Sequence, residues 1–434
     1  MKFYSTNNKN NIVSFREAVL NGIANDGGLF MPADIPKLPL NFFQNISNLS
    51  FREISFRVAK NLLENDLSDE TLTKIIDSAI TFDAPLVKLN EQMSVLELFH
   101  GPTLAFKDFG ARFMAEVMSF FINGANKEII ILVATSGDTG SAVANGFLNS
   151  AGIKVVLLYP SGRVSKIQEQ QLTTLDGNIT ALEVDGTFDD CQRLVKKAFA
   201  DSSLIEHSTL SSANSINIAR LIPQSFYYFN AYARTGNKKL PFYVSVPSGN
   251  FGNLTGGLFA YKMGLPVSKF IAAVNANDVF PKYLETSLFE AKPSVRTLSN
   301  AMDVGNPSNF ARILDLYAHN HQAIKDKIFS ESFSDLDTIG AIKEVYSKYN
   351  YLMDPHGAVG YLALKRFIEI TNQESYSGIF LETAHPSKFA DIVEKVLNKK
   401  IDMPYRLQDC LVKKKKSIKI SKEYEELKNF ILSI

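Results

Sequence analysis

A repeated order of strand, glycine loop and helix constrains the fold of this chain most strongly. Residues 128–134 (EIIILVA) are apolar and rich in β-branched side chains, which predicts a strand buried on both faces. The polar loop TSGDTG at 135–140 follows, and then a helix of small residues. The same order returns at 241–264, where PFYVSVPS leads into GNFGN and a second small-residue helix. A strand buried on both faces needs helices above and below it, so the pattern predicts an α/β fold with an open, mostly parallel sheet.

Further segments follow the same alternation. Apolar runs at 153–160, 179–186, 269–275 and 377–385 predict more buried strands, with helical patterns between several of them. Parallel neighbours connected through helices are the usual outcome of such an order. The long stretch 280–370 is expected to be mainly helical.

The first 95 residues do not alternate in this way and are expected to be mixed and mainly helical. Periodicity at 51–66 and 69–82 predicts two helices, and Ser14 and Ser68 are candidate N-caps. No pattern in this region indicates catalysis, so we expect a packing domain or a lid.

Composition and charge exclude several classes of protein. The 434 residues include 46 basic and 45 acidic side chains, and a net charge of +1 does not favour nucleic acid or a membrane surface as a partner. The basic run VKKKKSIKI near the C-terminus is expected to be a solvated surface segment. No apolar run is long enough for a membrane span, and the polar start lacks a signal-peptide core. The two cysteines, Cys191 and Cys410, form no CxxC pair, so a reducing, cytoplasmic setting fits.

Lys107 is the residue whose surroundings most suggest chemistry. It lies between Phe106 and Phe109, at the start of a predicted helix whose apolar side chains recur every four residues. Burial disfavours the charged ammonium and lowers its pKa, which yields an amine able to attack a carbonyl and form a Schiff base. The alternative is a lysine whose stem only covers aromatic rings at a helix start.

The two glycine loops are candidate anion sites. Each places free backbone N–H groups at the positive end of a helix dipole and at the carboxyl end of a strand. The loop at 135–140 adds hydroxyls that suit a carboxylate, and the negative charge of Asp138 would repel a phosphate placed beside it. The loop at 249–253 has no acid and suits a phosphate. The alternative for each is an ordinary strand-to-helix turn in which glycine supplies a positive φ.

Histidines and acids show no metal-binding pattern, and we expect no metal. The six histidines include no HExxH motif, and no Ser–His–Asp arrangement stands out. His356 and His385 lie in the turn-like sequences DPHG and TAHP, where either could line a site.

A carbonyl-reactive lysine, a phosphate loop and a carboxylate loop are the parts that a pyridoxal-phosphate enzyme needs. The sequence resembles the threonine synthase family, within the tryptophan-synthase-β-like (fold type II) pyridoxal-phosphate enzymes. The resemblance runs through most of the chain up to about residue 400. The motifs that carry it are DGGLFMP (26–32), HGPTLAFKDFGARFM (100–114), ATSGDTGSAV (134–143), YPSGRVSKIQEQQL (159–172), SANSINIARL (212–221), SVPSGNFGN (245–253), LSNAMDVGNPSN (298–309) and ETAHPSKF (382–389).

The resemblance implies roles for the matching residues. Lys107 is the expected Schiff-base lysine, and Thr383 is the hydroxyl expected to face the pyridine nitrogen of the cofactor, pyridoxal 5'-phosphate. The expected cradle for the cofactor phosphate is Gly249, Asn250, Phe251, Gly252 and Asn253. The expected loop around the substrate carboxylate and the cofactor O3′ is Ser136, Gly137, Asp138 and Thr139.

The resemblance also implies a reaction. O-phospho-L-homoserine and water would give L-threonine and phosphate by γ-elimination and β-addition of water, the last step of threonine biosynthesis. Lys107 would remove the Cα proton and then carry a proton at Cβ. The substrate phosphate needs a cationic or amide pocket. The candidates for that pocket are Arg163, Lys166, Asn214, Ser215, Asn217 and Arg220.

The fold implied by the resemblance has open, mostly parallel sheets in two domains around a cleft. A larger cofactor-binding domain would comprise 96–127 and 236–398, and a smaller domain at 128–235 would hold the carboxylate loop. Residues 1–95 would form the mixed N-terminal region and 399–434 a C-terminal tail. A monomer or homodimer is expected.

Three rival functions remain. A serine/threonine dehydratase or another β-replacing enzyme would share the fold but not the substrate phosphate. A threonine-synthase-like protein that binds phospho-ligands without turnover is disfavoured by the intact FKDFG motif. A dinucleotide-dependent dehydrogenase is disfavoured because the GxGxxG loop is missing.

Overall fold

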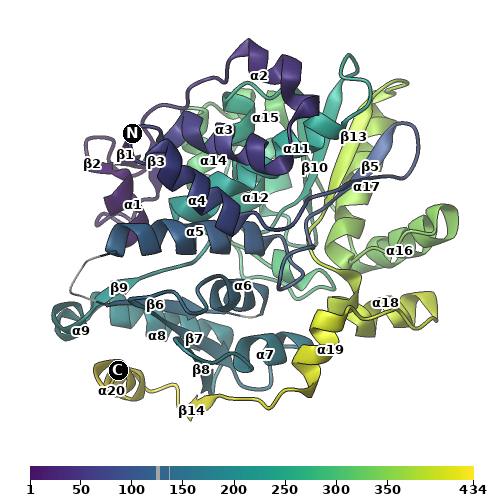
Figure 1. Cartoon of the computed structure of the whole chain (residues 1–434). Coiled ribbons are helices and arrows are strands. Elements are labelled where there is room, and N and C mark those ends of the chain that lie inside the picture. The colour runs from purple at the N-terminus through teal and green to yellow at the C-terminus, as the bar shows by residue number, and fades with distance from the viewer. Residues whose placement is uncertain (124–127, 136) are drawn as a thin grey trace.

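The computed structural model describes residues 1–123, 128–135 and 137–434. Its two larger sheets lie one above the other in Figure 1, with helices around and between them. The six-stranded sheet runs, in spatial order, β12 (Ile328–Ser332), β11 (Val267–Val274), β10 (Phe242–Pro247), β13 (Ser377–Glu382), β5 (Met93–Glu97) and β4 (Leu86–Lys88). The five-stranded sheet runs β14 (Ile418–Ile420), β8 (Ile179–Val184), β7 (Ile153–Pro160), β6 (Ile129–Ala134) and β9 (Thr209–Ser211).

Both larger sheets are mostly parallel, as the sequence predicts. Every pair in the five-stranded sheet is parallel, and in the six-stranded sheet only the edge strand β4 runs antiparallel to its neighbour. A third, antiparallel sheet of β2 (Ile12–Ser14), β1 (Lys2–Ser5) and β3 (Phe30–Pro32) lies in the N-terminal region. The predicted α/β class is therefore confirmed.

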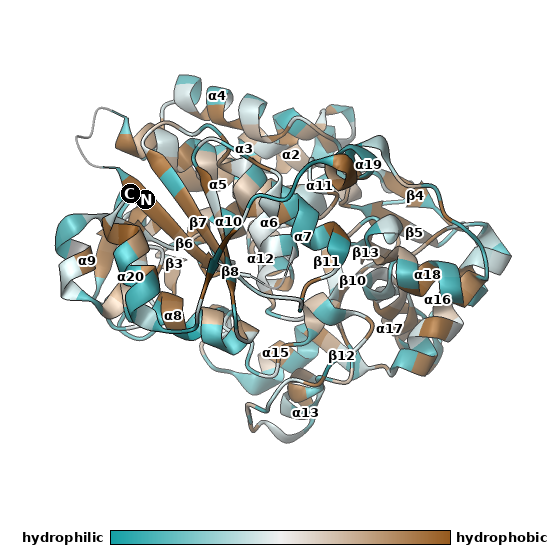
Figure 2. Ribbon diagram, turned by 90° about the horizontal axis from the view of Figure 1, so that it is seen from below, coloured by the Kyte–Doolittle hydropathy of each residue, from teal (hydrophilic) through white to brown (hydrophobic). Residues whose placement is uncertain are grey.

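The predicted burial of the strands on both faces is also confirmed. Along β6, the side chains of Ile129, Ile131 and Val133 join one hydrophobic core, while those of Ile130 and Leu132 join another on the opposite face. Alternate residues of β10 divide in the same way between two cores. In Figure 2 the strands β6 and β7 are accordingly among the most hydrophobic elements of the chain.

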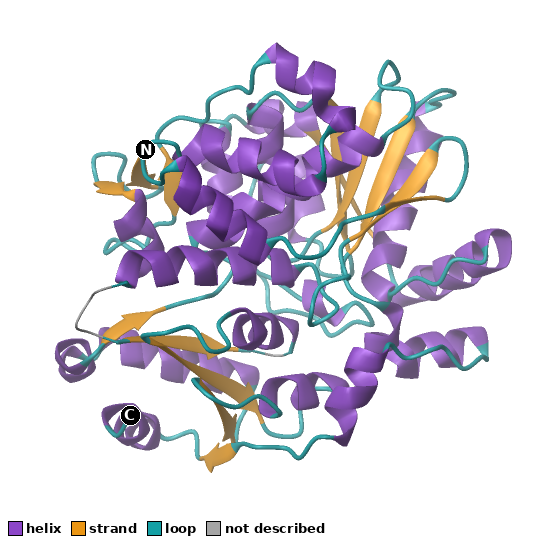
Figure 3. Ribbon diagram, in the orientation of Figure 1, coloured by secondary structure: helices purple, strands orange, loops and turns teal. Residues whose placement is uncertain are grey.

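Helices cover both faces of these sheets (Figure 3). They are α1 (Phe15–Asn21), α2 (Leu40–Asn45), α3 (Phe51–Leu63), α4 (Asp69–Ala79), α5 (Lys107–Ile122), α6 (Asp138–Gly146), α7 (Lys166–Thr173), α8 (Phe188–Ala200), α9 (Ser202–His207), α10 (Ile218–Leu221), α11 (Phe226–Arg234), α12 (Gly252–Lys262), α13 (Val279–Thr286), α14 (Phe310–Leu316), α15 (His321–Lys327), α16 (Asp335–Tyr349), α17 (Pro355–Thr371), α18 (Ala390–Leu397), α19 (Tyr405–Val412) and α20 (Tyr424–Leu432). Short 3₁₀ helices are η1 (Ile46–Asn48), η2 (Ile222–Ser225), η3 (Asn300–Met302) and η4 (Pro386–Phe389).

The local signals that predict helix starts act as expected. The Ser14 hydroxyl accepts the N–H of Glu17, whose carboxylate in turn accepts the N–H of Ser14, so the two form a capping box. Ser68 caps α4 in a similar way by accepting the N–H of Thr71.

None of the helices in the described part of the chain combines the length and the hydropathy that crossing a bilayer requires.

The C-terminal tail returns to the five-stranded sheet. β14 pairs with β8 in parallel, with Ile418 opposite Leu182. The basic run is exposed around Lys413, as expected of a surface segment, but Lys415 pairs with Glu169 and Glu183 at 2.7 Å each. The tail therefore completes the sheet that is otherwise built from residues 129–211. The domain boundaries given above stay a prediction.

We expect the docking of α20 to stabilise this sheet. Leu427 is fully buried, in a core that also contains side chains of β6, β7 and β8. Leu427→Ala removes buried methyl groups and should lower the free energy of unfolding by about 2–5 kcal/mol in a denaturant titration followed by circular dichroism. Leu432→Ala is the matched control on the same helix, because Leu432 is 38% exposed and its loss should cost less than about 0.5 kcal/mol. Equal effects of the two substitutions would contradict this prediction.

Candidate active site

Three adjacent parallel strands deliver most of the predicted cofactor residues to one edge of the six-stranded sheet. β10, β13 and β5 are neighbours and run in the same direction, so their carboxyl ends meet. The loop 249–253 follows β10, Thr383 follows β13, and the segment that leads to Lys107 follows β5. Thr383 is directly connected to the lysine segment, because its carbonyl accepts the N–H of Phe106 at 2.9 Å.

Lys107 is the first residue of α5 and is partly buried. Its Nζ lies 5.8 Å from the centre of the Phe106 ring. The apolar face of α5 predicted from the sequence is present, since Phe109, Phe113 and Val117 are fully buried. Desolvation lowers the pKa of Lys107. The carboxylate of Asp138 opposes this shift, whereas the cations Lys388 and Arg220 add to it. The surroundings therefore favour the neutral amine that attack on a carbonyl requires.

The loop 249–253 has the geometry of an anion cradle. Phe251 adopts a left-handed conformation with φ of 59°, and the eleven-residue helix α12 starts directly after it. Phe251, Gly252 and Asn253 are buried, yet among the described residues their backbone N–H groups have no hydrogen-bond acceptor. Buried N–H groups are rarely left unpaired, so this loop is prepared for an oxyanion such as a phosphate.

Side chains from two other segments hold this cradle in place. Asn250 Nδ2 donates to the hydroxyl of Ser215 at 2.8 Å, and Asn250 Oδ1 accepts the N–H of Ser308 at 2.6 Å. Behind them, Asn309 Nδ2 donates to the Asn250 carbonyl at 3.0 Å, and Asn309 Oδ1 accepts a bond from the buried Arg312. The loop is thus preformed. The sequence motifs around Ser215 and Asn309 are the signals that could have indicated this support.

The predicted carboxylate loop follows β6 in the other sheet. Ser136 lies outside the described residues. Gly137 has φ of 144°, and a Cβ there would lie 2.5 Å from atoms of the Gln168 side chain, so the position requires glycine. Thr139 is partly exposed, and Asp138 is buried. The Thr135 hydroxyl is used within the loop, where it accepts the N–H groups of Gly137 and Gly140.

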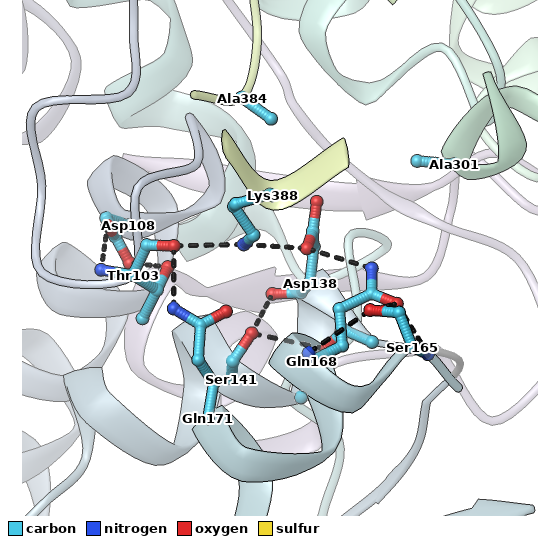
Figure 4. Close-up of polar contacts among 12 residues, drawn as sticks. Thr103, Asp108, Asp138, Ser141, Ser165, Gln168, Gln171, Ala301, Ala384 and Lys388 are labelled. Carbon is cyan, nitrogen blue, oxygen red and sulfur yellow. Dashed lines mark hydrogen bonds and ion pairs between the residues drawn. The ribbon is translucent and has the colours of Figure 1, made fainter. Parts of the chain in front are cut away.

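A buried ion pair between Asp138 and Lys388 was not foreseen from the sequence. Lys388 Nζ lies 2.7 Å from Asp138 Oδ1 and donates to the Thr103 carbonyl at 2.9 Å (Figure 4). Gln168 Nε2 donates to the same carboxylate at 3.2 Å. Burial raises the pKa of Asp138, but the charges of Lys388 and Lys107 outweigh it and hold that pKa well below its usual range. The lysine in the ETAHPSKF motif was the available signal.

Behind Thr383 lies a second group of buried acids. Glu382 Oε1 accepts the N–H of Asp354, and Asp354 Oδ1 accepts the N–H of His356. Burial, followed by the charge of Asp354, raises the pKa of Glu382 well above its usual range, which favours the protonated carboxyl. His356 Nε2 accepts the N–H of Ala301 at 3.1 Å, so this histidine is committed to structural contacts. Across the described ranges, no cluster of histidine, cysteine and acidic residues has the geometry of a metal site.

The six candidates for the substrate-phosphate pocket differ in their surroundings. Arg163 and Lys166 are exposed, and Asn214 and Ser215 are partly buried. Arg220 is 2% exposed, and its Nη1 donates to the Ala213 carbonyl. The Asn217 side chain caps α10 and donates to the Val19 carbonyl at 2.8 Å. Asn217 is therefore already engaged in local contacts, whereas Arg163 and Lys166 are accessible to a ligand.

Close packing of helices joins the two sheets near Lys107. A Cβ at Gly110 of α5 would lie 2.8 Å from the carbonyl oxygen of Arg220, and one at Gly146 of α6 would lie 2.9 Å from the carbonyl carbon of Ala111. These glycines let α5 approach α10 and α6 at backbone distance. Lys107 and the predicted carboxylate loop are therefore brought near each other, although they follow strands of different sheets.

The unpaired N–H groups of a preformed anion loop, together with a desolvated lysine, fit a phosphorylated aldehyde cofactor. A family model described as "Pyridoxal-phosphate dependent enzyme" matches residues 82–377, so the fold and the site define an enzyme of this class. Two further models, "Threonine synthase N terminus" and "Threonine synthase, C-terminal", match residues 2–80 and 357–431.

Comparison with full-length relatives identifies the family within this class of enzymes. The chain is 45% identical to threonine synthase of Haemophilus influenzae over 94% of both chains. It superposes on the crystal structure of threonine synthase from Escherichia coli with a TM-score of 0.92, 39% identity and complete coverage of both chains. The pyridoxal-phosphate-bound threonine synthase of Brucella melitensis superposes with a TM-score of 0.93 at 31% identity, covering 100% of this chain and 99% of that one. The chain belongs to the threonine synthase family of pyridoxal-phosphate-dependent enzymes.

The contact between α5 and α10 leads to a test by substitution. Gly110→Ala places a methyl group against the carbonyl of Arg220, which is backbone and cannot rotate away. The free energy of unfolding should fall by about 1–3 kcal/mol in a urea titration, as expected for overpacking. Gly340→Ala is the control, because nothing lies within 4 Å of a Cβ at this position in α16. It should stabilise the protein by about 0.4–1 kcal/mol, and a loss at Gly340 as large as that at Gly110 would contradict the explanation.

Proposed function

We propose that this chain converts O-phospho-L-homoserine and water to L-threonine and phosphate, the last step of threonine biosynthesis. The observation that carries this proposal is the meeting of Lys107 with two loops suited to different anions, one on each sheet. Membership of the threonine synthase family supports the same reaction. Bound pyridoxal phosphate would supply an electron sink that stabilises negative charge on the substrate carbons.

The residues divide the remaining work among them. The N–H groups of 249–253 would hold the cofactor phosphate, and the Thr383 hydroxyl would face the pyridine nitrogen. The loop with Gly137, Asp138 and Thr139, together with Ser136, would orient the substrate carboxylate. Lys107 would anchor the cofactor, then remove the proton from Cα and carry a proton at Cβ, because burial favours the uncharged amine, which can accept a proton.

The substrate carries a phosphate of its own, in addition to that of the cofactor, which distinguishes it from the substrates of dehydratases. Arg163 precedes α7 and Lys166 is its first residue, beside the carboxylate loop. Both are accessible cations that could bind the substrate phosphate. Ser215 contacts the loop 249–253 through Asn250, and Asn214 precedes Ser215 in the chain. Arg220 would act from a buried position through its charge. Asn217 is the weakest candidate, since its amide already has partners.

The direct test is turnover of O-phospho-L-homoserine by the wild type and by Lys107→Ala. Loss of the general base should reduce threonine formation by more than about 10²-fold. Lys348→Ala, at an exposed position in α16, should retain the wild-type rate. Threonine formed at similar rates by wild type and Lys107→Ala would reject the assignment of Lys107. Release of ammonia from threonine without turnover of the phospho-substrate would favour the dehydratase, and binding without turnover the non-catalytic protein.

The role of Arg163 can be tested by kinetics. A charge-assisted hydrogen bond contributes about 1.5–3 kcal/mol, so Arg163→Ala should raise KM for O-phospho-L-homoserine about tenfold or more with a smaller change in kcat. Arg193→Ala is the control, since Arg193 is an exposed arginine of α8 paired with Asp190. Added inorganic phosphate should inhibit the wild type more strongly than the Arg163→Ala variant. An unchanged KM would remove Arg163 from the pocket.

We also propose a cytoplasmic location and a monomeric or homodimeric state. The location is consistent with Cys191 and Cys410, which are both free thiols. Light scattering of the purified protein measures the oligomeric state directly.

A further inference from the structure

The Asp138–Lys388 pair is a buried electrostatic contact in the candidate site. The Lys388 side chain is 0% exposed and that of Asp138 is 5% exposed, and the two atoms are 2.7 Å apart. Asp138 begins α6 beside the five-stranded sheet, whereas Lys388 lies in η4 after β13 of the six-stranded sheet. Figure 4 shows Lys388 between the Thr103 carbonyl and the Asp138 carboxylate. The pair thus connects the two halves of the site.

A buried ion pair is costly, because both charges give up their hydration. Stability alone does not explain it well, since apolar side chains of similar size often serve as well or better. The nearby Lys107 offers a reason for the pair. Lys107 lies in the electrostatic field of both partners, as the opposing effects of Asp138 and Lys388 on its pKa show.

Lys107 is a second lysine whose charge acts on the Asp138 carboxylate. Among the residues that the structure describes, no acceptor lies within hydrogen-bond distance of Lys107 Nζ, and its charge has no acidic partner within 4.0 Å. Asp138 instead directs Oδ1 to Lys388 and Gln168. The acid next to Lys107 in sequence, Asp108, is turned away toward the N–H and hydroxyl of Thr103.

We propose that Lys388 is a positioning residue for Lys107: it holds the Asp138 carboxylate in a buried ion pair and so keeps that carboxylate from capturing the Lys107 amine. An amine held as an ammonium in an ion pair cannot attack a carbonyl, because its lone pair carries the extra proton. The pair also neutralises Asp138, so the loop that carries it can still receive an anionic ligand. This inference rests on the proposed role of Lys107 as the residue that binds the cofactor.

The direction of the effect follows from the charges that face Lys107. Asp138 from α6 raises its pKa, while Lys388 from η4 and Arg220 from α10 lower it. Lys388→Met removes one cation and releases the anion, so both changes raise the pKa of Lys107. Asp138→Asn removes the anion and lowers it. The double variant Asp138→Asn/Lys388→Met removes both charges and should return the pKa toward the wild-type value.

The experiment follows the covalent capture of pyridoxal phosphate by the full-length chain after the cofactor has been removed. Lys107 Nζ adds to the aldehyde carbon, a C=N bond replaces the C=O bond, and water leaves. The rate is measured by absorbance across a series of pH values, and the midpoint of the profile reports the ionisation of Lys107. We expect the midpoint of Lys388→Met to lie above that of the wild type by about one pH unit or more. At a pH below both midpoints the rate should therefore fall about tenfold.

Two controls separate this effect from damage to the fold. Lys388→Arg keeps the positive charge and should keep the wild-type midpoint. Pyridoxine 5'-phosphate has no aldehyde and cannot react with Lys107, so its affinity tests the pocket alone. That affinity should be similar in the wild type and in Lys388→Met. If Lys388→Met does not fold, the other two variants still test the proposal. The midpoint of Asp138→Asn should lie below that of the wild type, and the midpoint of the double variant should lie near it.

The outcomes are distinct. Equal midpoints in the wild type, Asp138→Asn and the double variant would overturn the role of Lys388, as would a loss of pyridoxine 5'-phosphate affinity without a shift of the midpoint. If the wild type itself does not capture pyridoxal phosphate, the proposed function fails instead. Capture by the wild type with ordered shifts among the variants supports both.

Discussion

Hydrogen bonding between the parallel strands β10, β13 and β5 is the constraint on which the candidate site depends. Parallel neighbours end at the same edge of a sheet, so the loops after these strands must meet there. This places the anion loop 249–253, Thr383 and the Lys107 segment side by side. The bond from Phe106 to the Thr383 carbonyl then fixes the lysine segment against β13.

The second sheet reaches this edge through helix packing. α5 carries Lys107 and touches α6 and α10 at Gly146 and Gly110, where any side chain would collide with backbone. The carboxylate loop at the start of α6 is therefore held close to Lys107 by the same helix that positions the lysine. The tail adds β14 to the five-stranded sheet and brings Lys415 to Glu183. Segments far apart in the chain thus determine how the two sheets face each other.

Burial and pairing together set the charge states of the ionisable groups in this site. Desolvation lowers the pKa of Lys107 and raises that of Glu382, while Lys388 and Gln168 occupy Asp138. The neutral form is thus favoured for Lys107 and Glu382, and Asp138 is paired, as a poorly hydrated environment requires. In the preformed cradle at 249–253, the N–H groups of Phe251, Gly252 and Asn253 have no acceptor among the described residues, and they are suited to a phosphate.

Much of this protein was determined by the sequence alone. Runs of β-branched residues predicted the buried parallel strands, and serine caps and four-residue periodicity predicted α1, α4 and α5, because these signals depend on neighbours within a few residues. Lys107 and both glycine loops could be identified as candidate site residues because their signals also lie within a few residues of the chain. The Asp138–Lys388 pair, the support of Asn250 by Asn309 and the return of the tail as β14 could not, since their partners are separated by at least 59 residues. Only the tertiary structure decided which charges face Lys107, because buried charges are paired by spatial proximity and not by their order in the chain.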